Sequence, residues 1–183
     1  AEWQNGRPVV IVTGAGNGFD SRTHAHWQNQ PNGLPQGVPA RWFWDLPAGD
    51  ASDSFMNIWS DRELGVGMTA PGGVESSVQV VPHQAAIYWS QGRAISLVAN
   101  LPRPATGAGC LIHVAVAPTD VLHNVVGAMA GAWSLVLQNS RAEPCRWDAW
   151  VDRDDAPFGS RAVPRAPSAL RDANPQARVI SER

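Results

Sequence analysis

The chain has 183 residues, of which 44% are hydrophobic and 16% charged, and its formal net charge at pH 7 is −2. This length and composition predict one globular domain or slightly more, and they exclude an intrinsically disordered protein. All 14 basic residues are Arg, which indicates a GC-rich coding sequence, and they form no basic stripe that could follow a phosphate backbone. We therefore expect no nucleic acid as a partner, and without a run of 18 apolar residues we expect no membrane partner.

The first predicted element is a strand over residues 8–14, where apolar, mostly β-branched residues follow one another without polar alternation. This pattern is typical of a strand buried on both faces in a parallel α/β sheet. The strand ends in the turn Gly14-Ala15-Gly16-Asn17-Gly18, and a loop rich in Asn, Gly and Pro continues to about residue 40.

The pattern changes after residue 40 to short alternating segments, which predict about nine strands separated by turn residues. These segments cover residues 41–46, 54–59, 63–69, 77–81, 85–89, 94–100, 111–117, 132–137 and 146–151. Many short strands at this spacing predict an antiparallel β-sandwich or jelly roll. The predicted fold class is therefore mainly β, with an N-terminal strand left from a parallel α/β sheet.

These patterns divide the chain into three parts. Residues 1–37 hold the first strand and its loop, residues 38–155 the sandwich, and residues 156–183 an extended return segment rich in Pro and Arg. Neither end can complete a sheet alone, because a parallel strand needs a crossover connection and a partner strand. We therefore expect the sandwich to be an insertion in a larger fold.

Residues 9–18, which read Val-Val-Ile-Val-Thr-Gly-Ala-Gly-Asn-Gly, resemble the strand and turn that carry the oxyanion-hole Asn of subtilisin-like serine proteases. A subset of bacterial members of that family holds a β-sandwich between this Asn and the nucleophile. The likeness continues through residues 21–26, 56–59, 66–73, 131–135 and 147–155. The resemblance thus covers most of the chain.

The resemblance implies that Asn17 donates its side-chain amide to the oxyanion in the intact parent. From the residues alone, the favoured interpretation is that Asn17 takes a left-handed turn conformation after its strand. The family pattern places the catalytic Asp and His before residue 1 and the Gly-Thr-Ser nucleophile turn after residue 183. The chain alone is then expected to be inactive, with a sandwich that modulates substrate access, folding or partner binding.

The same resemblance implies partners and a location. The expected partners are the remaining segments of the parent protease and, through it, a peptide or protein substrate. A secreted or cell-envelope location in a bacterium follows from the family. Ser168 does not supply a nucleophile, because its Ala-Pro-Ser-Ala context lacks the glycine and helix start of a nucleophile turn.

His24 and His26 form a His-x-His pair, whose imidazoles share one side of an extended segment as two ligands of a zinc triad would. The third ligand is not identified, since His113 and His123 are candidates only by elimination. We therefore assign no metal site to the pair and expect loop histidines held by hydrogen bonds.

A group of aspartates closes the last predicted strand. Asp148, Asp152, Asp154 and Asp155 could gather oxygen ligands for calcium, above all the last three, because sandwich domains often bind calcium at strand ends. The alternative is a solvated strand end paired with Arg146 or Arg153. No other cofactor is expected.

The candidate binding residues are Trp42, Trp44 and Trp150, because a row of exposed indoles suits stacking on sugar rings. Trp42 and Trp44 lie two apart and share one strand face, so the alternative is a place in the core, which we favour. An independent β-sandwich module that binds carbohydrate or protein is the alternative function. A third is an assembly protein whose unfinished ends complete a neighbour's sheet.

The two cysteines, Cys110 and Cys145, each precede a predicted strand. They could meet at one end of the sandwich and form a disulfide. They fit equally well as small buried apolar residues.

Overall fold

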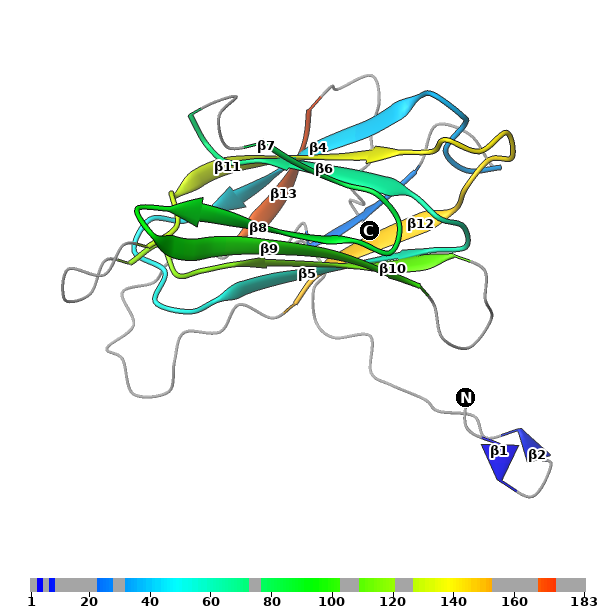
Figure 1. The fold of residues 1–183 in the computed structure, drawn as a ribbon, viewed down its shortest axis with the longest axis horizontal. Helices are drawn as coiled ribbons and strands as arrows, with labels where there is room; N and C mark the ends of the chain where they lie inside the picture. Colours follow the sequence, from blue (N-terminus) through cyan, green and yellow to red (C-terminus); the bar gives the residue numbers. More distant parts are fainter. Residues whose placement is uncertain are drawn as a thin grey trace.

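The computed structural model describes residues 3–4, 7–8, 23–27, 32–72, 77–102, 109–120, 127–152 and 168–173. These residues form strands and turns without a helix, and most of the strands belong to two antiparallel sheets that face each other (Figure 1). The short strands β1 (Trp3–Gln4) and β2 (Arg7–Pro8) pair with each other in a small sheet of their own. The mainly β sandwich that the sequence predicts is confirmed.

The larger sheet has six strands in the order β3-β12-β5-β10-β9-β8. Its strands are β3 (His24–His26), β5 (Ser54–Ser60), β8 (Ala85–Ser90), β9 (Arg93–Pro102), β10 (Cys110–Val116) and β12 (Trp147–Val151). The second sheet has five strands in the order β13-β4-β11-β6-β7. These are β4 (Pro39–Leu46), β6 (Gly65–Thr69), β7 (Ser77–Val80), β11 (Gly131–Gln138) and β13 (Ala169–Asp172).

The chain alternates between the sheets in the manner of a jelly roll. Strands β3, β4, β5 and β6 fall in the first and second sheets in turn, and β10, β11 and β12 return in the same way between them. This interleaving gives two sets of four neighbours, β3-β12-β5-β10 and β4-β11-β6-β7. The hairpin β8–β9 extends the first set beyond β10, and the strand β13 extends the second set beyond β4.

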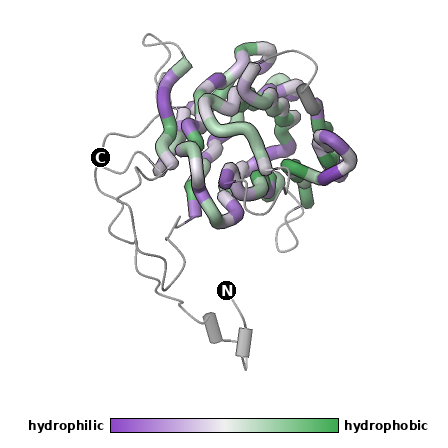
Figure 2. The backbone as a smooth tube through the Cα atoms, turned by 90° about the vertical axis from the view of Figure 1, so that its left-hand side faces the viewer, coloured by the Kyte–Doolittle hydropathy of each residue, from purple (hydrophilic) through white to green (hydrophobic). Residues whose placement is uncertain are grey.

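The core lies between the sheets and is built from alternate residues of each strand. Strand β4 shows the pattern clearly, because Trp42 and Trp44 are fully buried while Arg41 is exposed and Phe43 only half-buried. Figure 2 shows hydrophilic and hydrophobic residues interspersed along the chain of the sandwich. The indole rings of Trp42 and Trp147 stack across the two sheets, with centroids 5.2 Å apart.

The first and last strands of the sandwich lie on the same side of it. Strands β7 and β8 end the two sheets and contact each other, so β3 and β13 close the opposite side of both sheets. The Trp42–Trp147 stack joins β4 to β12, the strands next to those two edges. The chain therefore enters and leaves the sandwich along one side.

The sandwich takes in more of the chain than residues 38–155. All nine predicted strands have counterparts, β4 to β12, but β3 comes from the predicted first part and β13 from the predicted return segment. The edges of the sheets accept these strands because β12 and β4 each have one free side for hydrogen bonding. The predicted buried strand over residues 8–14 lies outside the described residues, apart from Pro8 in β2.

No helix in the described part of the chain is long and apolar enough to cross a membrane.

Candidate functional site

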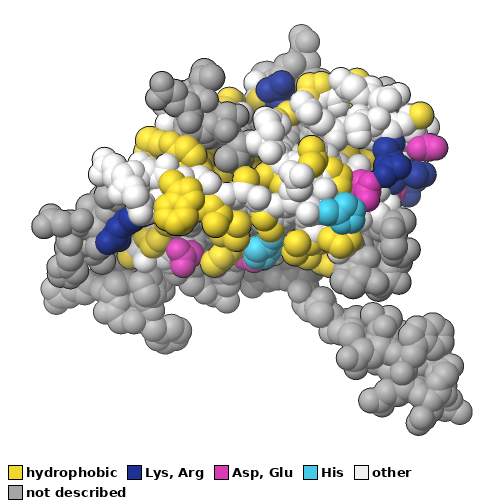
Figure 3. Space-filling view, in the orientation of Figure 1, with side chains coloured by type: hydrophobic (Ala, Val, Ile, Leu, Met, Phe, Trp, Pro, Cys, Tyr) yellow, Lys and Arg dark blue, Asp and Glu magenta, His cyan; other side chains and the backbone are white. Residues whose placement is uncertain are grey.

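The outer face of the six-stranded sheet carries an unusual set of side chains for a surface. Trp59 and Trp150 are each 42% exposed, and Trp89 is 59% exposed. Histidine, aspartate and asparagine side chains lie among these aromatic residues on the same face. Figure 3 shows hydrophobic side chains gathered where Figure 1 draws β8 and β9, at the front of the view. We call this surface the outer face.

Two short segments of the outer face lie side by side, one on the edge strand β3 and one on its neighbour β12. His24-Ala25-His26 of β3 lies antiparallel to Asp148-Ala149-Trp150 of β12, with Ala25 opposite Ala149. The two alanines are fully buried and point to the core, so the four larger side chains are left on the outer face. His26 then lies opposite Asp148, and His24 opposite Trp150.

Three of these side chains converge. His24 Nε2 lies 3.0 Å from Asp148 Oδ1, and the rings of His24 and His26 stack with centroids 5.2 Å apart. One ligand atom from each of His24, His26 and Asp148 lies within 4.8 Å of the others. Within the described ranges, these three residues form the group of His, Cys, Asp or Glu side chains that lie close enough together to hold a metal ion. We call these residues the His-His-Asp cluster.

The indole of Trp150 covers one side of the cluster. It lies nearly parallel to the His24 ring, at 9°, with centroids 4.9 Å apart. Two aromatic rings in this arrangement attract each other and limit the rotation of the imidazole. Trp150 therefore fixes the orientation of His24, while its own outer surface stays in solvent.

The protonation of His26 is also set by this arrangement. Burial lowers the pKa of His26, the neighbouring His24 lowers it further, and Asp148 acts in the opposite direction. Nδ1 of His26 is buried and has no hydrogen-bond partner among the described residues. The neutral imidazole is therefore favoured, and one of its nitrogens is not used by the fold.

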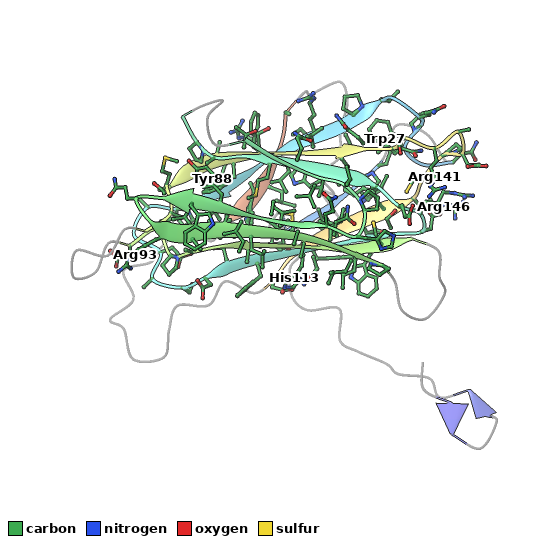
Figure 4. The ribbon with its side chains drawn as sticks, viewed as in Figure 1. Trp27, Tyr88, Arg93, His113, Arg141 and Arg146 are labelled. Carbon is green, nitrogen blue, oxygen red and sulfur yellow. The ribbon has the colours of Figure 1, made fainter. Side chains whose placement is uncertain are left out.

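A second polar group crosses the middle of the outer face. Asn57 on β5 accepts a hydrogen bond from His113 Nδ1, and its amide donates to Asp152 Oδ2 at 2.9 Å. The side chain of His113 points away from the core in Figure 4. Asn57 thus joins β10, β5 and the end of β12 across the surface.

The predicted calcium ligands are separated by these contacts. Asp148 lies against His24, whereas Asp152 accepts from Asn57, so the two carboxylates serve different neighbours. Asp154 and Asp155 lie outside the described residues. His113, one of the third zinc ligands considered by elimination, is bonded to Asn57, and His123 lies outside the described residues.

The three tryptophans chosen as binding candidates fall on opposite faces. Trp42 and Trp44 are completely buried, so they cannot contact a ligand at the surface and belong to the core, as the alternative interpretation held. Trp150 is exposed on the outer face, beside Trp59 on the neighbouring strand β5. Trp59 carries no motif of its own, and only the alternation of β5 could have indicated its exposure.

The sequence pointed to Asp148 only as a candidate calcium ligand and gave no sign that it is the third member of the His-His-Asp cluster. Asp148 is 122 or more residues away from the His pair, and only the pairing of β3 with β12 brings them together. The expectation that the histidines lie in a loop is wrong, because they lie on β3, but the expected hydrogen bond is present between His24 and Asp148.

The two cysteines meet at one end of the sandwich as buried thiols that are not joined in a disulfide. Cys110 lies opposite Ser60 in the β10–β5 pairing, and Cys145 Sγ is hydrogen-bonded to Ser60 Oγ at 2.8 Å. Burial raises the pKa of Cys145 to about 12, so the thiol stays protonated. The interpretation as small buried residues therefore holds in place of the disulfide.

Two residues complete the account of the predicted catalytic groups. Asn17 lies outside the described residues. Ser168 is buried, and its hydroxyl has no hydrogen-bond partner among the described residues, so no base contacts it there. A nucleophilic serine needs such a base within hydrogen-bond reach.

Comparisons with known proteins find similarity in structure but none in sequence. No family model and no curated protein sequence matches the chain. Among solved structures, the Clostridium perfringens CspB protease is similar, with a TM-score of 0.49 and 12% sequence identity. The match covers 76% of this chain and 28% of that protease, so the chain spans well under half of its length.

Proposed function

We propose that this chain is the non-catalytic β-sandwich of a subtilisin-like serine peptidase, inserted between the oxyanion-hole Asn and the nucleophile. One observation carries the proposal: the chain enters the sandwich on β3 and leaves it on β13, along the same side. A domain inserted into a host fold needs its two connections close together, since domain insertion is tolerated where the ends of the inserted domain are near each other.

The segment before β3 supports the same proposal. Residues 9–18 resemble the strand and oxyanion turn of this family, and β3 begins six residues after Gly18, at His24. In the proposed parent, the Asn17 amide donates a hydrogen bond to the oxyanion of the tetrahedral intermediate. Asp, His and Ser of the triad come from the parent segments that flank the sandwich.

The sandwich itself would act by binding rather than by chemistry. Its outer face offers exposed indoles and partly exposed polar groups, which are the residue types that protein and peptide partners contact. We propose that the remaining segments of the parent, or a peptide substrate entering its cleft, rest against this face. Access to the cleft then depends on the position of the sandwich.

A second candidate function is an independent carbohydrate-binding module. It is favoured by the exposure of Trp59 and Trp150 on the adjacent strands β5 and β12. A glycan array with the purified chain tests it, and binding that Trp59→Ala and Trp150→Ala abolish while Trp89→Ala preserves would support it. An array without any bound glycan would remove this candidate.

The peptidase proposal is tested by treating the natural polypeptide and this chain with a fluorophosphonate probe that labels activated serines. We expect the natural polypeptide to be labelled at a serine downstream of residue 183, and this chain to remain unlabelled and without hydrolysis of peptide or ester substrates. A natural polypeptide that carries no labelled serine would overturn the proposal. Labelling of this chain that replacement of one of its own serines removes would do the same.

A further inference from the structure

We propose that His24, His26 and Asp148 bind a zinc ion on the outer face, at the edge of the six-stranded sheet. The cluster offers two imidazoles and one carboxylate, which are common zinc ligands, from two adjacent strands. This site does not depend on the proposed peptidase function, because every ligand belongs to the sandwich.

The spacing of the cluster fits a tetrahedral ion. With zinc–ligand distances of about 2.0–2.2 Å, the ligand atoms of a tetrahedral site lie roughly 3.3 Å apart. His24 Nε2 and Asp148 Oδ1 are already 3.0 Å apart, and the ligand atoms of all three residues lie within 4.8 Å of one another. Small rotations of the His26 side chain would therefore complete three positions, and the fourth would be left to water.

The state of the ligands also fits a metal. The buried Nδ1 of His26 lacks a hydrogen-bond partner among the described residues, which an internal hydrogen-bond network alone does not account for. Stacking on Trp150 restrains His24, so less side-chain freedom is lost when an ion binds.

The choice of zinc follows from the donor set. Calcium and magnesium prefer oxygen ligands, and a site with two imidazoles disfavours both. A pair of histidines with one carboxylate also serves non-haem iron, but zinc binds more tightly than Fe²⁺ to a given set of such ligands. The exposed edge position of β3 leaves the fourth ligand position accessible from solvent.

Zinc bound at this site would also affect the stability of the fold. Strand β3 has only three residues, and among the described strands it pairs with β12 alone, so few of the described hydrogen bonds hold it to the sheet. A metal bound by both strands would add a link between the entering chain and the sandwich. Zinc should therefore stabilise the folded chain, and the effect should grow with zinc concentration.

The test uses the untagged chain after treatment with EDTA and exchange into metal-free buffer, titrated with ZnCl₂ in a calorimeter. We expect one Zn²⁺ per chain. His26→Ala and Asp148→Asn should each weaken binding by more than the roughly 10- to 100-fold that changes outside the direct ligands cost. The matched control is His113→Ala, which removes an outer-face histidine bonded to Asn57 instead and should leave the affinity unchanged.

Two further measurements keep the test decisive. Titration with CoCl₂ should produce the visible absorption of tetrahedral Co²⁺ with nitrogen ligands, and ZnCl₂ should displace it; FeSO₄ under anaerobic conditions should bind more weakly. The proposal is overturned if the unaltered chain binds no Zn²⁺, if Co²⁺ gives no tetrahedral spectrum, or if His113→Ala abolishes binding while His26→Ala and Asp148→Asn retain it. Any variant that fails to fold leaves the Co²⁺ spectrum of the unaltered chain to decide.

Discussion

Two tryptophans of strand β12 lie three residues apart and have opposite environments. Trp147 is 2% exposed and stacks on Trp42 of the facing sheet, whereas Trp150 is 42% exposed and stacks on His24 at the surface. An odd separation along a strand sends side chains to opposite faces. The same residue type therefore serves the core at one position and the candidate site at the other.

The comparison extends to the two faces of the whole sheet. The inner face holds apolar side chains and small residues, while the outer face mixes aromatic residues with His24, Asp148 and His113. The side chains of the inner face pack against the facing sheet and stabilise the fold. The outer face has no packing partner in the described chain, so packing within that part does not explain its residue types.

The largest expected effect separates the two tryptophans of β12 directly. Trp147→Ala should lower the free energy of unfolding by about 3–5 kcal/mol, because it removes a buried indole and leaves a cavity. Trp150→Ala should lower it by only about 0.5–1.5 kcal/mol in metal-free buffer, because it removes a half-exposed ring stack on His24 and leaves no cavity in the core. Urea unfolding followed by circular dichroism measures both, and similar losses in the two variants would contradict the assignment of faces.

A packed and an open position can also be compared on the backbone, at two glycines with positive φ. Gly33 has φ +104°, and an added Cβ would lie 2.4 Å from the carbonyl oxygen of Cys145, whereas Gly37 has φ +72° with open space around it. Gly33→Ala should therefore cost more than the roughly 1–2 kcal/mol expected for Gly37→Ala from the left-handed conformation alone. Equal losses in urea unfolding would show that the close approach at Gly33 is not real.

The reactivity of the two cysteines tests whether their end of the sandwich is buried. The denatured, unreduced chain should show two free thiols on titration with a disulfide reagent, and the native chain should react far more slowly, because burial raises the pKa of Cys145 to about 12. Ser60→Ala removes the hydrogen bond to Cys145 without exposing the thiol and serves as the control. Absence of free thiols after denaturation would mean that a disulfide joins Cys110 and Cys145.

The smallest expected effect concerns pH and the outer face. Because the pKa of His26 is lowered in the folded chain, the unfolded chain binds a proton more readily. The contribution of His26 to the free energy of unfolding is therefore complete above about pH 6.5. It is lost as the pH falls through the lowered pKa of His26 in the folded chain. Urea unfolding from pH 8 to pH 5 in EDTA should show a smaller loss for His26→Gln than for the unaltered chain, and an identical loss would contradict it.

The sandwich could be predicted from the sequence because strand alternation and turn residues are local features of the chain. Alternation and turn residues located β4 to β12, and the spacing of Trp42 and Trp44 allowed the core placement that the structure confirms. Strands β3 and β13 were not predicted, since three or four residues are too few for a periodic pattern and their partners are distant in sequence. Asp148 was missed as a neighbour of the histidines for the same reason: only strand pairing brings it there.

We propose that the sandwich belongs to a subtilisin-like peptidase in which Asn17 is the oxyanion donor. The most direct measurement is kcat for a peptide substrate with the natural polypeptide and its Asn17→Ala variant. We expect kcat to fall by about 10²–10³, the loss found when this donor is removed from a subtilisin, with KM little changed. A natural polypeptide without serine-dependent hydrolysis, or an unchanged kcat in the variant, would contradict the claim.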